Sequence, residues 1–222
     1  MKTYLLLLIL LQSMAAIAQE TFSWPIKELD TARDVAYLSE AEKNVILELN
    51  MVRYNPAKYA QLRMKWMEVF YSNNLLKIPG KEVFQTNEGK VAYLDCIKAL
   101  ENAKSAPILY PSKGMTKGCE LLVYDQSSTG NTGHKGSGNS SPTDRAKRFG
   151  QFNGYFAENI HYGDCEPGFV VISLLIDDGV QSRGHRKTIL SADFNTVGVA
   201  IGSHKTYNEM CVTTYATKFI EK

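Results

Sequence analysis

The C-terminal part of the chain carries the pattern that most constrains its fold. Residues 195–201 and 210–219 alternate β-branched and other side chains, and turn-forming residues at 202–208 separate the two segments. Two such segments joined by a turn are typical of an antiparallel β-hairpin. The sequence therefore predicts a sheet near the end of the chain.

The earlier segments have helical patterns. Residues 39–42, Ser-Glu-Ala-Glu, match a capping box, in which a serine hydroxyl and a glutamate carboxylate satisfy free amides at a helix start. The apolar spacing predicts helices over 40–54, 56–70, 88–103 and 115–124. Between and after them we expect a surface excursion over 71–88, a loop over 127–141 and a turn over 179–186. Residues 152–160 are predicted to form a strand, and residues 169–176 either a buried helix or a strand. Because helices precede strands, we expect an α+β fold in which helices cover an antiparallel sheet.

The ends of the chain predict its domain organisation and location. Residues 1–18 resemble a secretory signal peptide, with a basic start, an apolar run and a small-residue cleavage site. We expect an N-terminal extension over 19–38, a single domain over 39–222, and no later transmembrane segment. The protein would then be secreted or otherwise extracytoplasmic, in the periplasm or outside the cell.

The 25 basic and 23 acidic residues nearly balance, which argues against a nucleic acid partner.

Four cysteines lie in the part expected to be exported: Cys96, Cys119, Cys165 and Cys211. An oxidising compartment favours two disulfides over free thiols. The four cysteines can form two disulfides in three different pairings, and the sequence does not choose among them. Pairing of neighbours along the chain would stabilise the fold by ~3–4 kcal/mol for each bridge. A metal–thiolate site is the alternative, although no Cys-x-x-Cys sequence occurs.

Most of the histidines and several acids lie between Gly133 and His204. His134 falls in a glycine-rich loop, where a lone histidine is usually only solvated, whereas His185 follows a glycine and precedes an anchoring apolar pair. Glu158 falls in the predicted strand, where an acid is unfavourable unless it is paired. It is therefore either part of a structural salt bridge or a carboxylate that faces the two histidines.

Two adjacent acids, Asp177 and Asp178, precede Gly179, which is also common turn chemistry. Two histidines with one or two acids can form a divalent metal site with open positions, although their spacing matches no short metal motif. The sequence has no nucleophile elbow, phosphate-binding glycine loop or dinucleotide fingerprint. We interpret His161 and His204 as surface or turn residues.

Several stretches, taken in order, resemble the CAP superfamily, which groups cysteine-rich secretory proteins, antigen 5 and pathogenesis-related proteins around an SCP-like domain. Residues 157–163, Ala-Glu-Asn-Ile-His-Tyr-Gly, are similar to the family's Gly-Glu-Asn-Ile motif. Residues 182–190, followed by Val-Gly-Val-Ala at 197–200, resemble the Gly-His-Arg-x-Asn-Ile-Leu and Val-Gly-Val pattern of bacterial-type members. Residues 49–56 resemble the family's first helix.

The resemblance implies a three-layer α/β/α sandwich around a central, mainly antiparallel sheet. It also implies a cleft with two histidines and two acids, which the motifs assign to His134, Glu158, His185 and Asp178, with Asp177 as the other choice for the second acid. The chain departs from the family pattern at three positions, where the usual Gly, Trp and Asn are replaced by Ala157, Leu175 and Thr188.

Members of this family are proposed to bind divalent cations, lipids or partner proteins, or to cleave peptides. The resemblance therefore implies a secreted binding module whose cleft holds a divalent metal such as zinc through His134 and His185. One alternative is a metal-assisted, peptidase-like hydrolase with Glu158 and His185 as catalytic residues. Another is an interaction or lipid-binding protein with a vestigial cleft. The partner would be a small ligand, a lipid or a protein, and enzymatic activity is left open.

Overall fold

The computed structural model describes residues 24–222, so the predicted signal peptide lies outside the described residues. The main sheet has the strand order β4-β6-β7-β5. Its strands are β4 (Tyr110–Pro111), β5 (Gly150–Tyr162), β6 (Thr196–His204) and β7 (Asn208–Glu221). The predicted hairpin is confirmed as β6 and β7, with His204 opposite Asn208 at its turn. The β4–β6 pair is parallel and the other two pairs are antiparallel.

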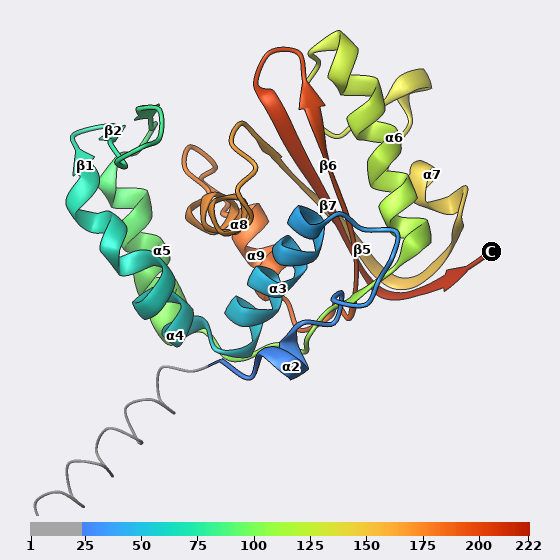
Figure 1. The fold of residues 1–222 in the computed structure, drawn as a ribbon, viewed down its shortest axis with the longest axis horizontal. Helices are drawn as coiled ribbons and strands as arrows, with labels where there is room; N and C mark the ends of the chain where they lie inside the picture. The colour runs from blue at the N-terminus through green and yellow to red at the C-terminus, as the bar shows by residue number, and fades with distance from the viewer. Residues whose placement is uncertain (1–23) are drawn as a thin grey trace, which may run out of the picture.

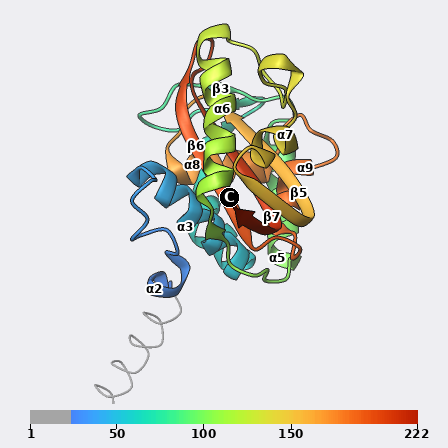
Figure 2. The ribbon, with the colours of Figure 1, turned by 90° about the vertical axis from the view of Figure 1, so that its right-hand side faces the viewer.

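Helices cover both faces of this sheet (Figure 1). On one face lie α6 (Lys113–Thr129) and α7 (Pro142–Lys147), and on the other lie α3 (Glu40–Tyr54), α8 (Pro167–Ile176) and α9 (Gly184–Leu190). Figure 2 shows α6 running along the outer face of the sheet. The expected α+β class and three-layer sandwich are thus confirmed.

A further unit packs on α3 and α8, on their side away from the main sheet (Figure 1). It contains α4 (Pro56–Tyr59), the π-helical η1 (Ala60–Met64), the 3-10 helix η2 (Lys65–Phe70), α5 (Lys90–Asn102), and a small antiparallel sheet of β1 (Tyr71–Ser72), β2 (Leu75–Leu76) and β3 (Phe84–Gln85). The helix predicted over 56–70 therefore exists, but its winding changes twice. The surface excursion predicted over 71–88 holds the small sheet.

Local sequence explains where several helices start and stop. Ser39 caps α3 with the predicted box, accepting from the Glu42 amide while the Glu42 carboxylate accepts from the Ser39 amide. The segment 169–176 is helical, because α8 is apolar on nearly all sides and most of its residues are buried. The helix predicted over 115–124 is longer, because α6 runs to Thr129; Gly130, which follows it, has a φ of +73° that suits glycine.

Buried polar side chains of α3 connect distant segments. Arg53 donates to the carbonyls of Ile189 at 2.6 Å and Phe194 at 2.7 Å, which fixes the end of α9. Burial lowers the pKa of Arg53 to about 10. Asn50 donates to the Leu29 carbonyl at 2.8 Å, which ties the short helix α2 (Ile26–Leu29) to the core. The described part of the expected N-terminal extension therefore packs against the domain.

The expected disulfides are not formed, and Cys96, Cys119, Cys165 and Cys211 are free and buried. Cys96 lies on α5 and Cys119 on α6, so the layers of the sandwich separate them (Figure 1). Cys119 instead contacts the Thr214 hydroxyl at 3.3 Å, and Cys165 donates to the Gly163 carbonyl at 3.3 Å.

Between residues 24 and 222, no helix is both long and apolar enough to span a bilayer.

Candidate functional site

Glu158 is a buried acid on β5, at the edge of the main sheet. Its side chain is 1% exposed, and its two oxygens face different partners. Oε1 lies 3.0 Å from Nδ1 of His134, and Oε2 accepts a hydrogen bond from Arg145 at 2.5 Å. The expectation that this acid is paired is confirmed. It forms the salt bridge with Arg145, and of the two histidines it contacts His134, while His185 pairs with another acid.

The loop that carries His134 is held on both sides, although its sequence is rich in glycine. The Gly133 amide donates to the Tyr162 hydroxyl at 2.8 Å, and the Gly133 carbonyl accepts from Gln126 at 2.7 Å. Arg145 donates to the His134 carbonyl at 3.0 Å. The imidazole is half exposed, so the backbone is fixed while the ring remains open to solvent.

A second histidine–acid pair lies at the start of α9. His185 Nδ1 is 2.6 Å from Asp177 Oδ1, and the His185 amide donates to Asp177 Oδ2 at 2.9 Å. Asp177 ends α8 in the left-handed region, with φ of +56°, which turns its side chain toward α9. The Asp177 side chain is 1% exposed and that of His185 is 27% exposed, so the acid is buried and the ring reaches the surface.

Asp177, and not Asp178, is the acid that contacts His185. Asp178 points to the other side of the turn and accepts from the backbone amides of Asn87 at 2.6 Å and Glu88 at 2.8 Å. Of the two acids considered in the sequence, Asp177 is therefore the one that pairs with His185. The reason is local, because the left-handed conformation at Asp177 reverses the chain and sends the two neighbouring carboxylates in different directions.

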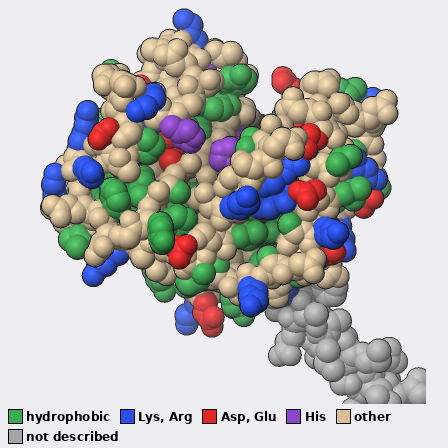
Figure 3. Space-filling view, turned by 180° about the vertical axis from the view of Figure 1, so that it is seen from behind, with side chains coloured by type: hydrophobic (Ala, Val, Ile, Leu, Met, Phe, Trp, Pro, Cys, Tyr) green, Lys and Arg blue, Asp and Glu red, His purple; other side chains and the backbone are tan. Residues whose placement is uncertain are grey.

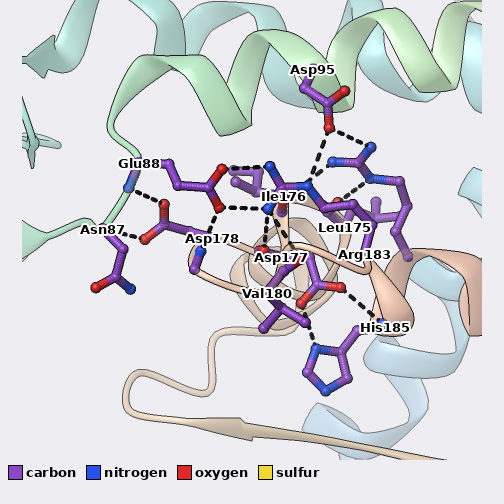
Figure 4. A network of polar contacts seen from close by, with 12 residues as sticks. Asn87, Glu88, Asp95, Leu175, Ile176, Asp177, Asp178, Val180, Arg183 and His185 are labelled. Carbon is purple, nitrogen blue, oxygen red and sulfur yellow. Dashed lines mark hydrogen bonds and ion pairs between the residues drawn. The ribbon is translucent and has the colours of Figure 1, made fainter.

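A polar network joins this turn to the start of α5 (Figure 4). Arg183 donates to both carboxylate oxygens of Glu88, at 2.6 and 2.7 Å, and to the Asp177 carbonyl at 2.8 Å. The hydrogen bonds from Arg183 and from the Gly179 amide lower the pKa of Glu88 to about 2. Figure 4 shows the His185 ring on the side of the turn away from Glu88 and Arg183, where it meets Asp177, so this network holds the turn without contacting the ring.

The two pairs approach the same edge strand from opposite layers of the sandwich. His134 lies in the loop between α6 and α7, and His185 lies on α9. Glu158 contacts the first, and the adjacent Asn159 donates to the His185 carbonyl at 3.2 Å. Successive side chains of a strand point to opposite faces, and an edge strand has one open side. Figure 3 shows exposed histidine side chains beside a hollow on this face of the molecule.

The other two histidines are buried; the surface or turn interpretation is wrong for His161, which lies in β5, whereas His204 does lie at the hairpin turn. His161 lies 3.0 Å from the Asp164 carbonyl and packs edge-on against Phe169. Burial lowers its pKa. His204 lies 2.9 Å from the Asn131 carbonyl, and its Nδ1 accepts from the amides that follow it in the hairpin turn. Both are therefore structural residues, while His134 and His185 keep exposed rings.

The sequence profile of the cysteine-rich secretory protein family, CAP, matches residues 54–216 of this chain. The chain belongs to the CAP family. Among curated protein sequences, none matches it significantly. Two solved structures are similar to it. An extracellular protein containing an SCP domain, from Bacillus anthracis, has 20% sequence identity and a TM-score of 0.41, with 51% of this chain and 35% of that protein covered.

The second similar structure is an outer surface protein of Borrelia burgdorferi. It shares 15% sequence identity at a TM-score of 0.41, and the match covers 57% of this chain and 90% of that protein. This chain thus spans about a third of the Bacillus protein and most of the Borrelia protein.

Two residues of this candidate site were not identified from the sequence. Arg145 binds Glu158 and the His134 loop, and Asn159 binds the backbone of His185. A signal for the first was present, because residues 141–144, Ser-Pro-Thr-Asp, form a capping box that starts α7, the helix that carries Arg145. No pattern in the sequence pointed to a role for Asn159.

Within residues 24–222, no group of three or more His, Cys, Asp or Glu side chains is arranged to hold a metal ion. The two imidazoles with exposed rings, His134 and His185, are therefore the candidate donors. Each of them meets a carboxylate through Nδ1. A histidine that donates through Nδ1 presents Nε2 as a lone pair, which is the form that binds a metal.

Proposed function

We propose that this CAP protein is an exported binding module whose cleft binds a divalent cation through Nε2 of His134 and His185. One observation carries the proposal: each of these two rings is oriented by a buried carboxylate at Nδ1, by Glu158 for the first and by Asp177 for the second. Carboxylate–histidine pairs of this kind orient metal ligands in many proteins and raise their basicity. The signal-like residues 1–18 support export.

The chemistry of the donor set fits a borderline cation such as zinc. Imidazole nitrogens suit zinc, copper and nickel, and a closed structural zinc site needs four protein ligands. With two imidazoles, a bound ion would keep positions for water or for a ligand donor atom. Such an ion would supply a point of attachment for an electron-rich group. The residues of the chain supply orientation, since buried Glu158 and Asp177 fix the two rings.

The contacts of Glu158 give less support to a hydrolase. A general base must reach a water molecule in the cleft. The Glu158 side chain is 1% exposed, and its oxygens are occupied by His134 and Arg145. These contacts suit an acid that positions a histidine. The proposal therefore places Glu158 in an orienting role and gives no residue of the cleft a catalytic one.

Zinc titration calorimetry on the mature chain tests this function. We expect one zinc ion to bind the wild-type protein, His134→Gln or His185→Gln to weaken it by on the order of a hundredfold, and the double variant to bind none. Glu120→Gln is the matched control, because Glu120 is an exposed acid on α6. Absence of zinc heat in the wild type, or zinc binding that survives in the double variant, would overturn the proposal.

A digestion assay separates binding from catalysis. A mixed peptide library is incubated with the zinc-loaded protein and with the Glu158→Gln variant. Binding alone predicts no cleavage by either protein. Zinc-dependent cleavage that is lost in Glu158→Gln would instead establish the hydrolase.

A further inference from the structure

A cavity of about 470 Å³ lies between α8, the small sheet β1–β3 and the end of β5. Its wall is largely apolar and includes Phe84 of β3 and Phe169 and Ile172 of α8. This volume is in the range of small-molecule sites, which are mostly apolar with a few polar groups at fixed places. Figure 3 shows the hollow between the two raised parts of this face, with hydrophobic side chains along it.

The charged groups of the cavity all have one sign. Asp177 and Asp178 line it, together with His185, and neither lysine nor arginine is among the lining residues. The arginines of the neighbouring network, Arg183 and Arg186, line a separate hollow that faces α5. These arginines therefore lie outside the lining of the cavity, while both acids are among its lining residues. Apolar walls strengthen the negative potential of such a site.

Aromatic rings border the cavity on two sides. Phe84 and Phe169 pack with ring centroids 4.9 Å apart, and Tyr162 and Tyr207 with centroids 5.4 Å apart, and all four line the space. The faces of aromatic rings attract ammonium groups. Phe169 already takes part in one such contact, because the Lys81 ammonium lies 5.1 Å from its centroid. Acids and ring faces together complement a positive charge attached to an apolar body.

We propose that this cavity binds an organic ammonium ion with an apolar tail, with the ammonium at the Asp177 and Asp178 end and the tail against Phe84, Phe169 and Ile172. An anionic amphiphile of the same length is disfavoured, because its head would meet two carboxylates and no lysine or arginine among the lining residues. This inference does not depend on the zinc site, since the acids and the apolar wall are present without a metal.

The test compares ligands that differ only in their head group. Octylammonium, octanol and octanoate are titrated into the mature chain by calorimetry at neutral pH in excess EDTA, so that metal binding plays no part. We expect octylammonium to bind on the order of tenfold more tightly than octanoate, with octanol between them. Shortening the tail to hexylammonium should weaken binding by about fourfold for each methylene removed.

Two variants assign the selectivity to the cavity. Asp178→Asn should reduce the preference for octylammonium over octanol. Because Asp178 also binds the start of α5, Gln85→Lys provides a second probe that keeps both acids. Gln85 is exposed on β3 and lines the cavity, so a lysine there should reverse the preference in favour of octanoate.

Val69→Lys is the matched control, because it adds the same charge at a residue that is 80% exposed and outside the lining. The wild-type preference should survive in this variant. Equal binding of octanoate and octylammonium, binding of none of the three ligands, or a preference unchanged by Gln85→Lys would overturn the inference. None of these results bears on zinc binding by His134 and His185.

Discussion

Arg145 donates to Glu158 at 2.5 Å, and both side chains are only 1% exposed. The same guanidinium donates to the carbonyls of His134 and Ser140, each at 3.0 Å. One buried cation therefore neutralises the acid and also holds the backbone of the loop that presents the histidine. The geometry of the candidate ligand His134 depends on this cation as much as on Glu158.

Replacing Arg145 by methionine should destabilise the fold strongly. The variant leaves Glu158 buried without its cation, and breaking a buried pair from one side lowers the free energy of unfolding by about 3–5 kcal/mol. The double variant Arg145→Met, Glu158→Leu removes both charges and should recover much of the loss. Urea denaturation at neutral pH measures both. If Arg145→Met lowered the free energy of unfolding by no more than about 1 kcal/mol, the ion pair between Arg145 and Glu158 would behave as a solvent-exposed one, contrary to this prediction.

The ion pair between Glu88 and Arg183 should make stability depend on pH in the acid range. The pKa of Glu88 is lowered from its ordinary value of 4.5 to about 2 in the folded state, so the folded chain releases this proton more readily than the unfolded chain. The stabilising contribution is full above the unfolded pKa and is lost as the pH falls through the folded pKa. Acid therefore weakens the link between α5 and the α8–α9 turn.

The variant Glu88→Gln isolates this contribution. The difference in unfolding free energy between wild type and variant should be largest above about pH 5 and should shrink toward about pH 2. Urea denaturation at a series of pH values measures it. A difference that stays constant over this range would contradict the assigned pKa shift.

The patterns in the sequence predicted helices on an antiparallel sheet because the signals of these elements are local, while the three layers were implied by the family resemblance. The capping box at Ser39 and the alternation of the C-terminal hairpin each lie within one element, and both are confirmed. The small strand β4 was missed for the opposite reason, since its two residues pair with β6, which is far away in the sequence. A two-residue strand is too short to show the alternation of side chains from which a strand is predicted.

The site shows the same division between local and long-range information. Motif order placed His134, Glu158 and His185 in one region, and the structure gives each histidine an acidic partner. The choice between Asp177 and Asp178 needed the left-handed backbone at Asp177, which apolar spacing does not encode. Arg145 was missed because its partner Glu158 lies on another element and the contact has no fixed spacing in the sequence.

The four thiols should be present as free groups that react slowly in the native protein. Burial raises the pKa of Cys96, Cys119 and Cys165 to about 12 and also raises that of Cys211 well above its usual value. At pH 8 a thiol with such a pKa is ionised on the order of one part in ten thousand, and the thiolate is the reactive form.

Titration with a chromogenic disulfide reagent checks these thiols. Four groups should react in denaturant and almost none in the native state. The intact mass, measured without reductant, should equal that of the fully reduced chain. A mass lower by the hydrogens lost in two bridges would contradict the free-thiol state and restore the disulfides first expected from the sequence.

Gly198 on β6 sets the close approach of α6 to the sheet. A Cβ atom at this position would lie 2.5 Å from the Met115 carbonyl carbon and 2.6 Å from the Thr116 amide nitrogen, both backbone atoms of α6. Backbone cannot move aside as a flexible side chain can, so Gly198→Ala should lower the free energy of unfolding by about 1–3 kcal/mol through overpacking.

Gly184→Ala is the matched control, because Gly184 lies on α9 and its nearest contact for a Cβ atom is the Ser182 hydroxyl at 3.5 Å. Alanine favours a helix over glycine, so this variant should be neutral or slightly stabilising. Thermal and urea denaturation of both variants measure the effect. Equal stability of the two would show that α6 can shift away from β6 without loss, and the close packing of this layer on the sheet would then not limit the fold.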